Sequence, residues 1–306
     1  MVQPAPERDR GIRIGPAGWA YEDWAGVVYP LPRPRGFDPL IFVARFFDLI
    51  EVNSTFYRSP AAKACASWVE RTADRPRFRF TAKLHRAFTH DADPRAREAE
   101  EPRFKAGIRP LAASGRLRAL LAQFPHSFRA VEESWARIAE LRERFADLPL
   151  VVEVRRAEWG APECVERLRA LGAGFCNIDQ PAVGRGPGAT LAPTGVATSS
   201  TAYVRFHGRD AETWFDSEER PWARYDWLYA EADLRPWVET IRALSATTEE
   251  THVVLNNHFR GKAVVNALMI RAMLEGRPVE APEGLLAEYP AAAPFLAGPG
   301  QGRLFS

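Results

Sequence analysis

Charged side chains recur at the ends of short apolar segments of this sequence, and their types point to acid and base chemistry. Glu51 and Glu153 are candidates for a general acid and base, because the pKa of a carboxylate in a partly dry cavity can move toward neutral pH. Asp179 is a third such carboxylate. His207 is placed to share proton transfer or to orient a substrate, and Lys83 offers a primary amine, whose chemistry a guanidinium lacks. We predict these five as catalytic residues.

A second group of residues is predicted to bind a substrate. The cations Lys83, Arg155 and Arg205 accompany the carboxylates, and this mixture favours a small anionic or polyhydroxylated molecule such as a sugar phosphate. In parallel barrels phosphate is commonly held by the loops after the last two strands and by a helix N-terminus, where this chain has Gly208, Asn257, Gly261 and Lys262. The predicted binding residues are Trp19, Tyr21, Asn53, Tyr57, Arg58, His85, Gln123, Arg155, Asn177, Arg205, Asn256, Asn257, His258 and Lys262.

Three other interpretations stay open. Acidic residues and histidines could hold a divalent metal, as in a metal-dependent phosphodiesterase or DNA-repair-type nuclease, although the three cations would crowd that site; we therefore predict no cofactor. The candidate metal ligands are Glu51, Glu153, Asp179, His207 and His258. The chain could instead be a non-enzymatic ligand-binding or scaffold protein that uses the aromatic-rich insertion 209–232. Finally, the acidic and basic side chains could be internal ion pairs with only a structural role.

The elements that position these residues alternate between strand and helix. Eight β-rich segments are separated mostly by segments of helical period, which is the pattern of a closed parallel barrel. We predict an α/β fold of the TIM-type (β/α)8 class, with one irregular Pro- and Gly-rich connection, 181–200, after strand 6. In LIEVNST, Ile50 and Val52 should face the outer helices, so Glu51 and Asn53 should point into the barrel. The predicted strands are 12–18, 48–55, 78–85, 117–125, 150–156, 172–179, 202–208 and 251–257.

Composition narrows the class of protein further. The 306 residues carry a formal net charge of +2, so no strong overall field favours nucleic acid as a partner. An apolar run long enough for a signal peptide or a membrane span is absent from the sequence, and the cysteines are three widely spaced residues. We expect a cytoplasmic protein, whose oligomeric state these features leave open. The predicted organisation is a loosely held N-terminus (1–11), one barrel domain (12–276) and a weakly structured C-terminal extension (277–306).

Several sequence blocks, in this order and spacing, resemble the YecE-like family, known as domain of unknown function 72. The resemblance implies a TIM-type barrel and no particular activity. One departure is notable: where such proteins usually have Glu-Phe-Arg-His before a tryptophan, this chain has Arg156 in place of the histidine, which affects any mechanism that requires that imidazole. The blocks are GPAGWAYEDWAGVVYP, FDLIEVNSTFYRSP, FRFTAKLHRAFTH, LLAQFPHSF, VVEVRRAEW, NIDQP, YVRFHG and NNHFRGKAVVNA.

Overall fold

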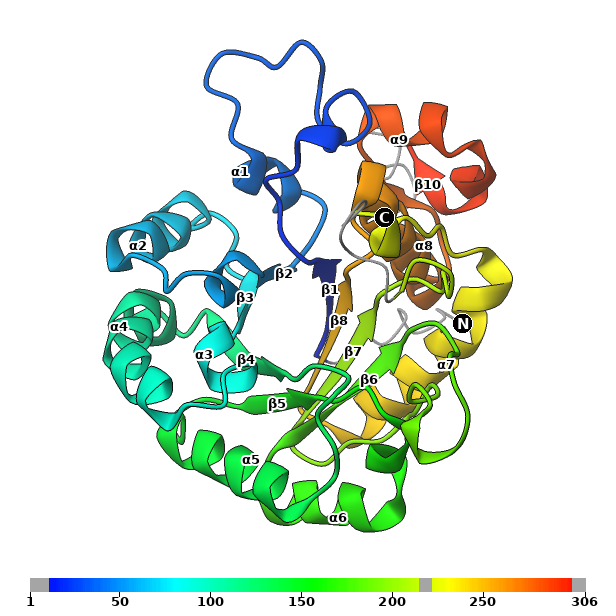
Figure 1. The fold of residues 1–306 in the computed structure, drawn as a ribbon. Helices are drawn as coiled ribbons and strands as arrows, with labels where there is room; N and C mark the ends of the chain where they lie inside the picture. The colour runs from blue at the N-terminus through cyan, green and yellow to red at the C-terminus, as the bar shows by residue number, and fades with distance from the viewer. Residues whose placement is uncertain (1–10, 215–221, 299–306) are drawn as a thin grey trace, which may run out of the picture.

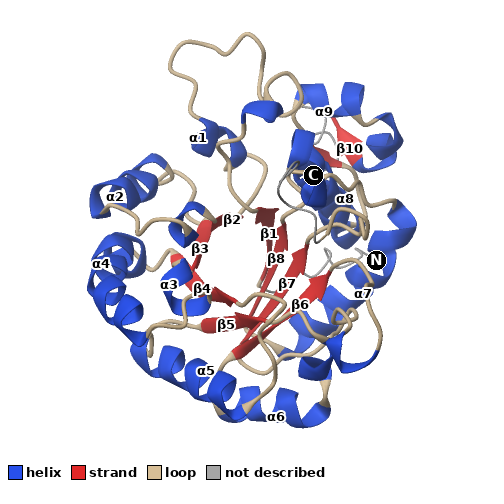
Figure 2. Ribbon diagram, viewed as in Figure 1, coloured by secondary structure: helices blue, strands red, loops and turns tan. Residues whose placement is uncertain are grey.

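The computed structural model describes residues 11–214 and 222–298, so almost all of the predicted loose N-terminus lies outside the described residues. Eight strands surround a central axis and helices surround the strands (Figures 1 and 2). This confirms the predicted TIM-type class. The barrel strands are β1 (Ile12–Pro16), β2 (Leu49–Val52), β3 (Arg79–Lys83), β4 (Leu117–Gln123), β5 (Leu150–Glu153), β6 (Gly174–Asp179), β7 (Thr201–Phe206) and β8 (Glu250–Leu255).

All neighbouring strands pair in parallel, in the order β1-β8-β7-β6-β5-β4-β3-β2. The seam between β1 and β2 closes through one bridge, in which Gly18 N donates to the Glu51 carbonyl at 2.9 Å. Gly15 is required beside this seam, since a Cβ at this position would lie 1.8 Å from the Leu49 carbonyl oxygen. The absence of a side chain therefore lets β1 and β2 approach closely enough to close the ring.

The helices lie outside the barrel, as the right-handed strand-helix-strand connection requires (Figure 2). The connection after β6 contains only a short 3-10 turn, Gly186–Gly188, which confirms the predicted irregular segment. Helix α4 continues through Pro102 and Pro110. The helices are α1 (Pro39–Val43), α2 (Ala62–Arg71), α3 (Arg86–Thr89), α4 (Pro94–Ala113), α5 (Glu132–Arg144), α6 (Pro162–Ala170), α7 (Glu231–Thr247), α8 (Lys262–Glu275) and α9 (Glu283–Glu288).

The strands are buried on both faces, but the two faces differ in polarity. On β2 the outward Ile50 and Val52 pack in the apolar layer under the helices, whereas the inward Glu51 is also fully buried. The barrel interior therefore contains charged groups that must be paired within the protein. The alternation read from the sequence is correct for this strand.

The segment after α8 is more ordered than its sequence suggests. It forms β9 (Val279–Glu280), α9 and β10 (Leu296–Ala297), and the two short strands pair in parallel. Leu285 of α9 is fully buried in the main apolar core. The expectation of weak structure is thus wrong for residues 279–297, because buried leucines anchor a segment that contains many proline and alanine residues.

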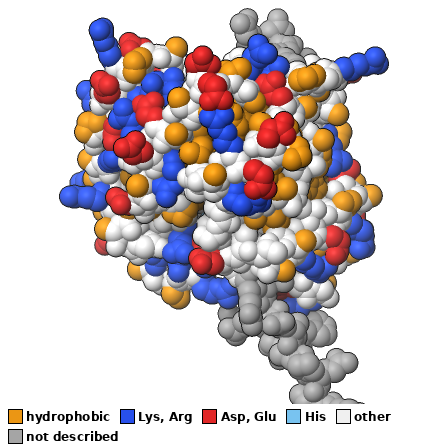
Figure 3. All heavy atoms as spheres, turned by 90° about the horizontal axis from the view of Figure 1, so that it is seen from below, with side chains coloured by type: hydrophobic (Ala, Val, Ile, Leu, Met, Phe, Trp, Pro, Cys, Tyr) orange, Lys and Arg blue, Asp and Glu red, His pale blue; other side chains and the backbone are white. Residues whose placement is uncertain are grey.

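The surface carries interspersed charges. In the face drawn in Figure 3, basic and acidic side chains alternate without a broad patch of one sign. Among the described residues, none of the helices is long and apolar enough to cross a membrane.

Candidate functional site

A cavity of about 380 Å³ opens at the carboxyl ends of the strands. This volume is within the range of small-molecule sites. Residues from the loops after β1, β2, β5, β7 and β8 and from the ends of β3, β4 and β7 surround it, so the barrel brings together residues up to about 240 positions apart. The lining residues are Gly18, Trp19, Ala20, Tyr21, Asn53, Ser54, Tyr57, Lys83, Gln123, Arg155, Arg205, Tyr225, Asn256 and His258.

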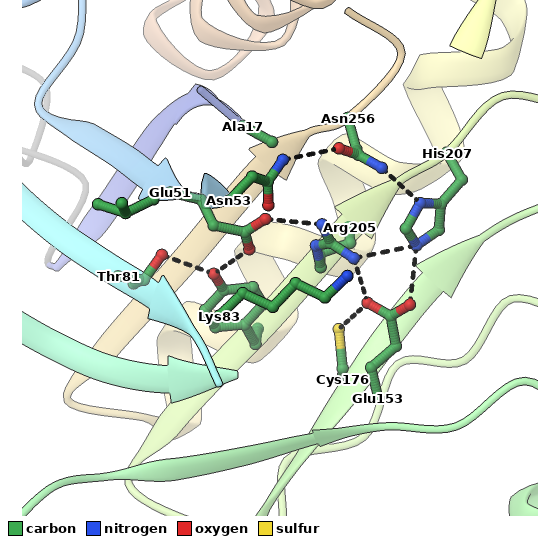
Figure 4. Close-up of polar contacts among 12 residues, drawn as sticks. Ala17, Glu51, Asn53, Thr81, Lys83, Glu153, Cys176, Arg205, His207 and Asn256 are labelled. Carbon is green, nitrogen blue, oxygen red and sulfur yellow. Dashed lines mark hydrogen bonds and ion pairs between the residues drawn. The ribbon is translucent and has the colours of Figure 1, made fainter. Parts of the chain in front are cut away.

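Arg205 on β7 is the centre of the polar network beneath this cavity. Its Nη2 donates to Glu51 Oε1 at 2.6 Å and its Nη1 donates to Glu153 Oε2 at 2.5 Å (Figure 4). All three side chains are almost completely buried. The second oxygen of Glu51 accepts from the Tyr203 hydroxyl at 2.8 Å. One guanidinium thus links strands β2, β5 and β7 by charge-assisted hydrogen bonds.

A second chain of contacts runs from Glu153 toward the rim. Glu153 Oε1 accepts from Arg155 Nη2 at 2.6 Å and lies 3.1 Å from His207 Nε2. The other ring nitrogen of His207 lies 3.1 Å from the Asn256 amide nitrogen, and Asn256 Oδ1 accepts from Asn53 at 3.3 Å. Figure 4 shows this continuous path from β5 across β7 to the loops after β8 and β2.

The network fixes the protonation of two predicted catalytic groups. Burial would raise the pKa of Glu153, but Arg205, Arg155 and His207 hold it well below 4.5, so this carboxylate stays ionised at neutral pH. Burial, with the nearby charge of Arg155, lowers the pKa of His207 to about 3, so its imidazole is neutral. An ionised, fully paired carboxylate is a poor general acid, and this argues against that role for Glu153.

The two carboxylates predicted for proton transfer do not line the cavity. Glu51 and Glu153 lie behind Arg205 and are inaccessible to solvent. Their oxygens bind Arg205, Arg155 and neighbouring side chains, which gives both residues a positioning role toward the guanidiniums that do reach the cavity.

Lys83, at the end of β3, differs from the other charged residues of the mouth. Its side chain extends toward Arg205 and Glu153, and no dashed line reaches its amine in Figure 4. Its Nζ lies 3.8 Å from the centre of the Phe56 ring. Burial, and then the positive charge of Arg205, lower the pKa of Lys83 from 10.5 to about 7. Lys83 is therefore a cavity residue that can exchange a proton near neutral pH.

Two predicted residues on β6 point away from the barrel. Asp179 accepts hydrogen bonds from Arg209, the Tyr229 hydroxyl and the Trp237 indole, on the side of α7. Asn177 bonds to backbone and side-chain groups of the loop 181–200, including both backbone polar groups of Val196. The prediction that they face the mouth is wrong. Asn177 thus binds the loop that stands in place of a helix after β6, and Asp179 binds side chains of the segment after β7 and of α7.

The groups predicted to bind phosphate after β7 and β8 form hydrogen bonds and ion pairs with other parts of the protein. Asn257 donates to the Trp227 carbonyl at 2.8 Å and to Asn266 Oδ1 at 2.9 Å, and Lys262 forms an ion pair with Asp226. Gly208 N donates to the Tyr229 hydroxyl at 2.8 Å. These groups fix the insertion against α8, and none of them lines the cavity.

Two further predicted binding residues lie next to the mouth. Arg58 and His85 line a separate hollow of about 750 Å³ on the outer side, which also contacts Trp68 on α2 and Glu100 on α4. His85 Nδ1 accepts from the backbone at the start of α3. Tyr57, 74% exposed, lines both this hollow and the mouth cavity.

The described part of the insertion 209–232 packs onto the mouth. Trp214 is buried against Arg155, whose guanidinium lies 5.1 Å from the indole centre, and against His207. Tyr225 lines the cavity beside His258, which in turn stacks on Tyr21 at 4.2 Å. The aromatic residues therefore form part of the wall of the cavity. Residues 215–221 lie outside the described residues.

The candidate metal ligands do not converge. Asp179 lies outside the barrel, and His258 is stacked on an aromatic ring. Within residues 11–214 and 222–298, no group of three or more His, Cys, Asp and Glu side chains is arranged to hold a metal ion. The residues present do not fit the metal-dependent interpretation.

The sequence interpretation missed three members of the site. Tyr203 and Cys176 face inward beside Glu51 and Glu153, respectively. The sequence pattern could have identified Tyr203, because residues two positions apart in a strand point to the same face and Tyr203 lies two positions before Arg205. Tyr225 comes from the insertion, where strand periodicity gives no signal.

Arg156, which stands where the family pattern has a histidine, pairs with Glu158 at 3.1 Å and is not among the residues that line the cavity.

Comparisons of the sequence and of the fold with known proteins identify the same family. The family model described as "Protein of unknown function DUF72" matches residues 13–290. The UPF0759 protein YunF of Bacillus subtilis is 26% identical over 275 residues, covering 86% of this chain and 95% of that protein. The structure of a DUF72 family protein from Thermotoga maritima has a TM-score of 0.74 at 32% identity, covering 87% and 99% of the two chains. A DUF72 family protein from Enterococcus faecalis, 24% identical, shares the fold, with a TM-score of 0.72 and coverage of 86% and 95%.

Proposed function

The chain belongs to the DUF72 family of proteins of unknown function, and we propose that its barrel mouth is the active site of an enzyme acting on a small anionic or polyhydroxylated substrate. A sugar phosphate is one such substrate. The observation that carries this proposal is the polarity of the cavity wall: cations and amides line it, while the carboxylates lie behind them.

The charges support an anionic substrate. Three basic side chains, Lys83, Arg155 and Arg205, accompany two carboxylates, and His207 is neutral. When Lys83 is protonated, the group carries one excess positive charge. This charge lies in a partly enclosed space, where electrostatic attraction is stronger than in water.

Unpaired buried polar atoms support a ligand that offers several hydrogen bonds. Arg155 Nε, Asn53 Oδ1 and His258 Nδ1 belong to cavity-lining residues and have no hydrogen-bond partner among residues 11–214 and 222–298. Such atoms are uncommon in folded proteins and call for a partner from outside the chain. Gln123 adds an amide at the same wall. A polyhydroxylated anion offers both donors and acceptors to this set.

Lys83 is the group best suited to proton transfer in this site. With a pKa of about 7, roughly half of its amines are neutral at pH 7 and can accept a proton. Proton abstraction next to a carbonyl group is a step shared by many isomerases and lyases, and a base with this pKa suits it. Glu51 and Glu153 contribute by holding Arg205 and Arg155 in place.

Thermal denaturation with a ligand panel tests this function. Dihydroxyacetone phosphate and inorganic phosphate, at a hundred times their dissociation constants, should stabilise the protein by about 2.7 kcal/mol, or about 4 °C, whereas sodium chloride at the same ionic strength should not. Arg155→Gln should abolish the shift, and Arg235→Gln, an exposed arginine of α7, should retain it.

Two other outcomes of the ligand panel would refute the proposal. If only divalent cations stabilise the protein, and it binds DNA in a salt-sensitive manner, the nuclease alternative would replace it. If no small ligand has an effect and another protein copurifies, the scaffold alternative would replace it.

A further inference from the structure

We propose that Lys83 is a nucleophile that binds a small aldehyde or ketone covalently as an imine, which makes the substrate a carbonyl compound with an anionic group. This inference rests on the proposed function and narrows its substrate class. The inference follows from the position of the Lys83 amine. The amine lies close to guanidinium groups and to an aromatic ring, and the neighbouring carboxylate is already paired with those guanidinium groups.

The environment of Lys83 leaves its amine unpaired. Glu153, the carboxylate toward which the Lys83 side chain extends (Figure 4), is already bound by Arg205 at 2.5 Å and by Arg155 at 2.6 Å. Within the described residues, Lys83 Nζ forms no hydrogen bond or ion pair, and its neighbour is the face of Phe56. An ammonium ion in an ion pair stays protonated and unreactive, and here the guanidiniums prevent such a pair.

The other lysines show how distinct this environment is. All four lysines of the chain lie in the described residues. Lys105 pairs with Glu101 at 2.6 Å, Lys262 pairs with Asp226, and Lys63 is exposed on α2. Lys83 alone among them lines the mouth cavity. Desolvation next to other cations is a known way to activate a lysine nucleophile, and the lowered pKa agrees with it.

The chemical step is balanced without an oxidant. The lone pair of Lys83 Nζ forms a bond to the carbonyl carbon, and the C–O π electrons move to oxygen. The oxygen leaves as water, carrying the two hydrogens that the amine gives up, and a C=N bond forms. The cavity offers Arg155 and Gln123 for the anionic group of the same molecule. Protonation of the imine from solvent gives an iminium ion, which that anion can stabilise.

The reactivity of Lys83 can be tested without an anionic substrate. Limiting formaldehyde with cyanoborohydride at pH 7 forms imines that the hydride reduces to methylamines, and peptide mass spectrometry assigns each lysine. We expect Lys83 to be methylated at least about tenfold faster than Lys63 or Lys105, since an amine of ordinary pKa is less than about 0.1% neutral at pH 7. Methylation of Lys63 and Lys105 with Lys83 untouched would overturn the inference.

Substrate-like probes separate the two proposals. Pyruvate and dihydroxyacetone phosphate, each followed by borohydride, should give a reduced adduct on Lys83 in the wild-type protein and in Lys63→Met, and no adduct in Lys83→Met. Thermal stabilisation by a probe without an adduct would refute the imine and leave the anion site intact. An adduct with pyruvate in a protein that inorganic phosphate and dihydroxyacetone phosphate fail to stabilise would support the imine and refute a sugar phosphate as the substrate.

Discussion

Replacing Lys83 by methionine should stabilise the protein at neutral pH, the reverse of the usual effect of an interior substitution. A lysine whose pKa falls from 10.5 to about 7 on folding makes its full unfavourable contribution below pH 7 and none above pH 10.5. This contribution is about 4 kcal/mol at pH 7 and about 2 kcal/mol at pH 9. Methionine can fill the same space against Phe56 without a charge.

Urea denaturation, followed by tryptophan fluorescence at pH 7, 8 and 9, measures this effect. The free energy of unfolding of Lys83→Met should exceed that of the wild type by about 4 kcal/mol at pH 7, and the difference should shrink by about 2 kcal/mol at pH 9. Lys63→Met, on the exposed side of α2, should follow the pH dependence of the wild type. If the difference in free energy of unfolding between Lys83→Met and the wild type does not change with pH, the charge of Lys83 does not destabilise the folded protein and the prediction is refuted.

Three further predictions concern the residues that hold the barrel together. Arg205→Met leaves two buried carboxylates without their shared partner and should lower the free energy of unfolding by about 3–5 kcal/mol in urea; a loss below 1 kcal/mol would contradict the network. Gly15→Ala places a Cβ against the Leu49 carbonyl and should cost about 1–3 kcal/mol, measured as a lower urea midpoint. At the amino-terminal rim, burial opposes the ionisation of Glu250, but hydrogen bonds from His252 and Arg118 lower its pKa to about 2. Its stabilising effect is therefore complete above pH 4.5 and disappears as the pH falls toward 2. Between pH 4.5 and pH 2 the free energy of unfolding of Glu250→Gln should therefore fall less than that of the wild type. An acid unfolding curve identical to that of the wild type would show that Glu250 does not contribute.

The arrangement of charges in the mouth follows a pattern expected of a functional site. Buried ion pairs contribute little net stability, because desolvation offsets their attraction. The Glu51–Arg205–Glu153 network nevertheless spans three strands, and it leaves Lys83 without a counterion. A buried amine without a counterion lowers stability, and such a loss of stability is common where a site holds reactive groups in place.

The order of strand and helix segments along the chain suffices to predict the barrel and the rim at which many of its polar residues gather. Parallel strands joined by helices bring all their carboxyl ends to one side, and Lys83, Gln123 and Asn256, which end three of these strands or follow them, line one cavity there. The period of two also placed Glu51 inside correctly, since Ile50 and Val52 identify the opposite face.

The direction in which the polar residues of β6 point, and the pairing of charges between strands, become visible only in the folded protein. Asn177 and Asp179 alternate with Cys176 and Ile178 along β6. The polar pair points outward, where the loop 181–200 binds Asn177 and the side chains of Tyr229 and Trp237 bind Asp179. Arg205 lies 154 positions from Glu51, so its pairing depends on barrel closure. The pKa of Lys83 depends on desolvation and on charges from other strands, quantities that exist only when the chain is folded.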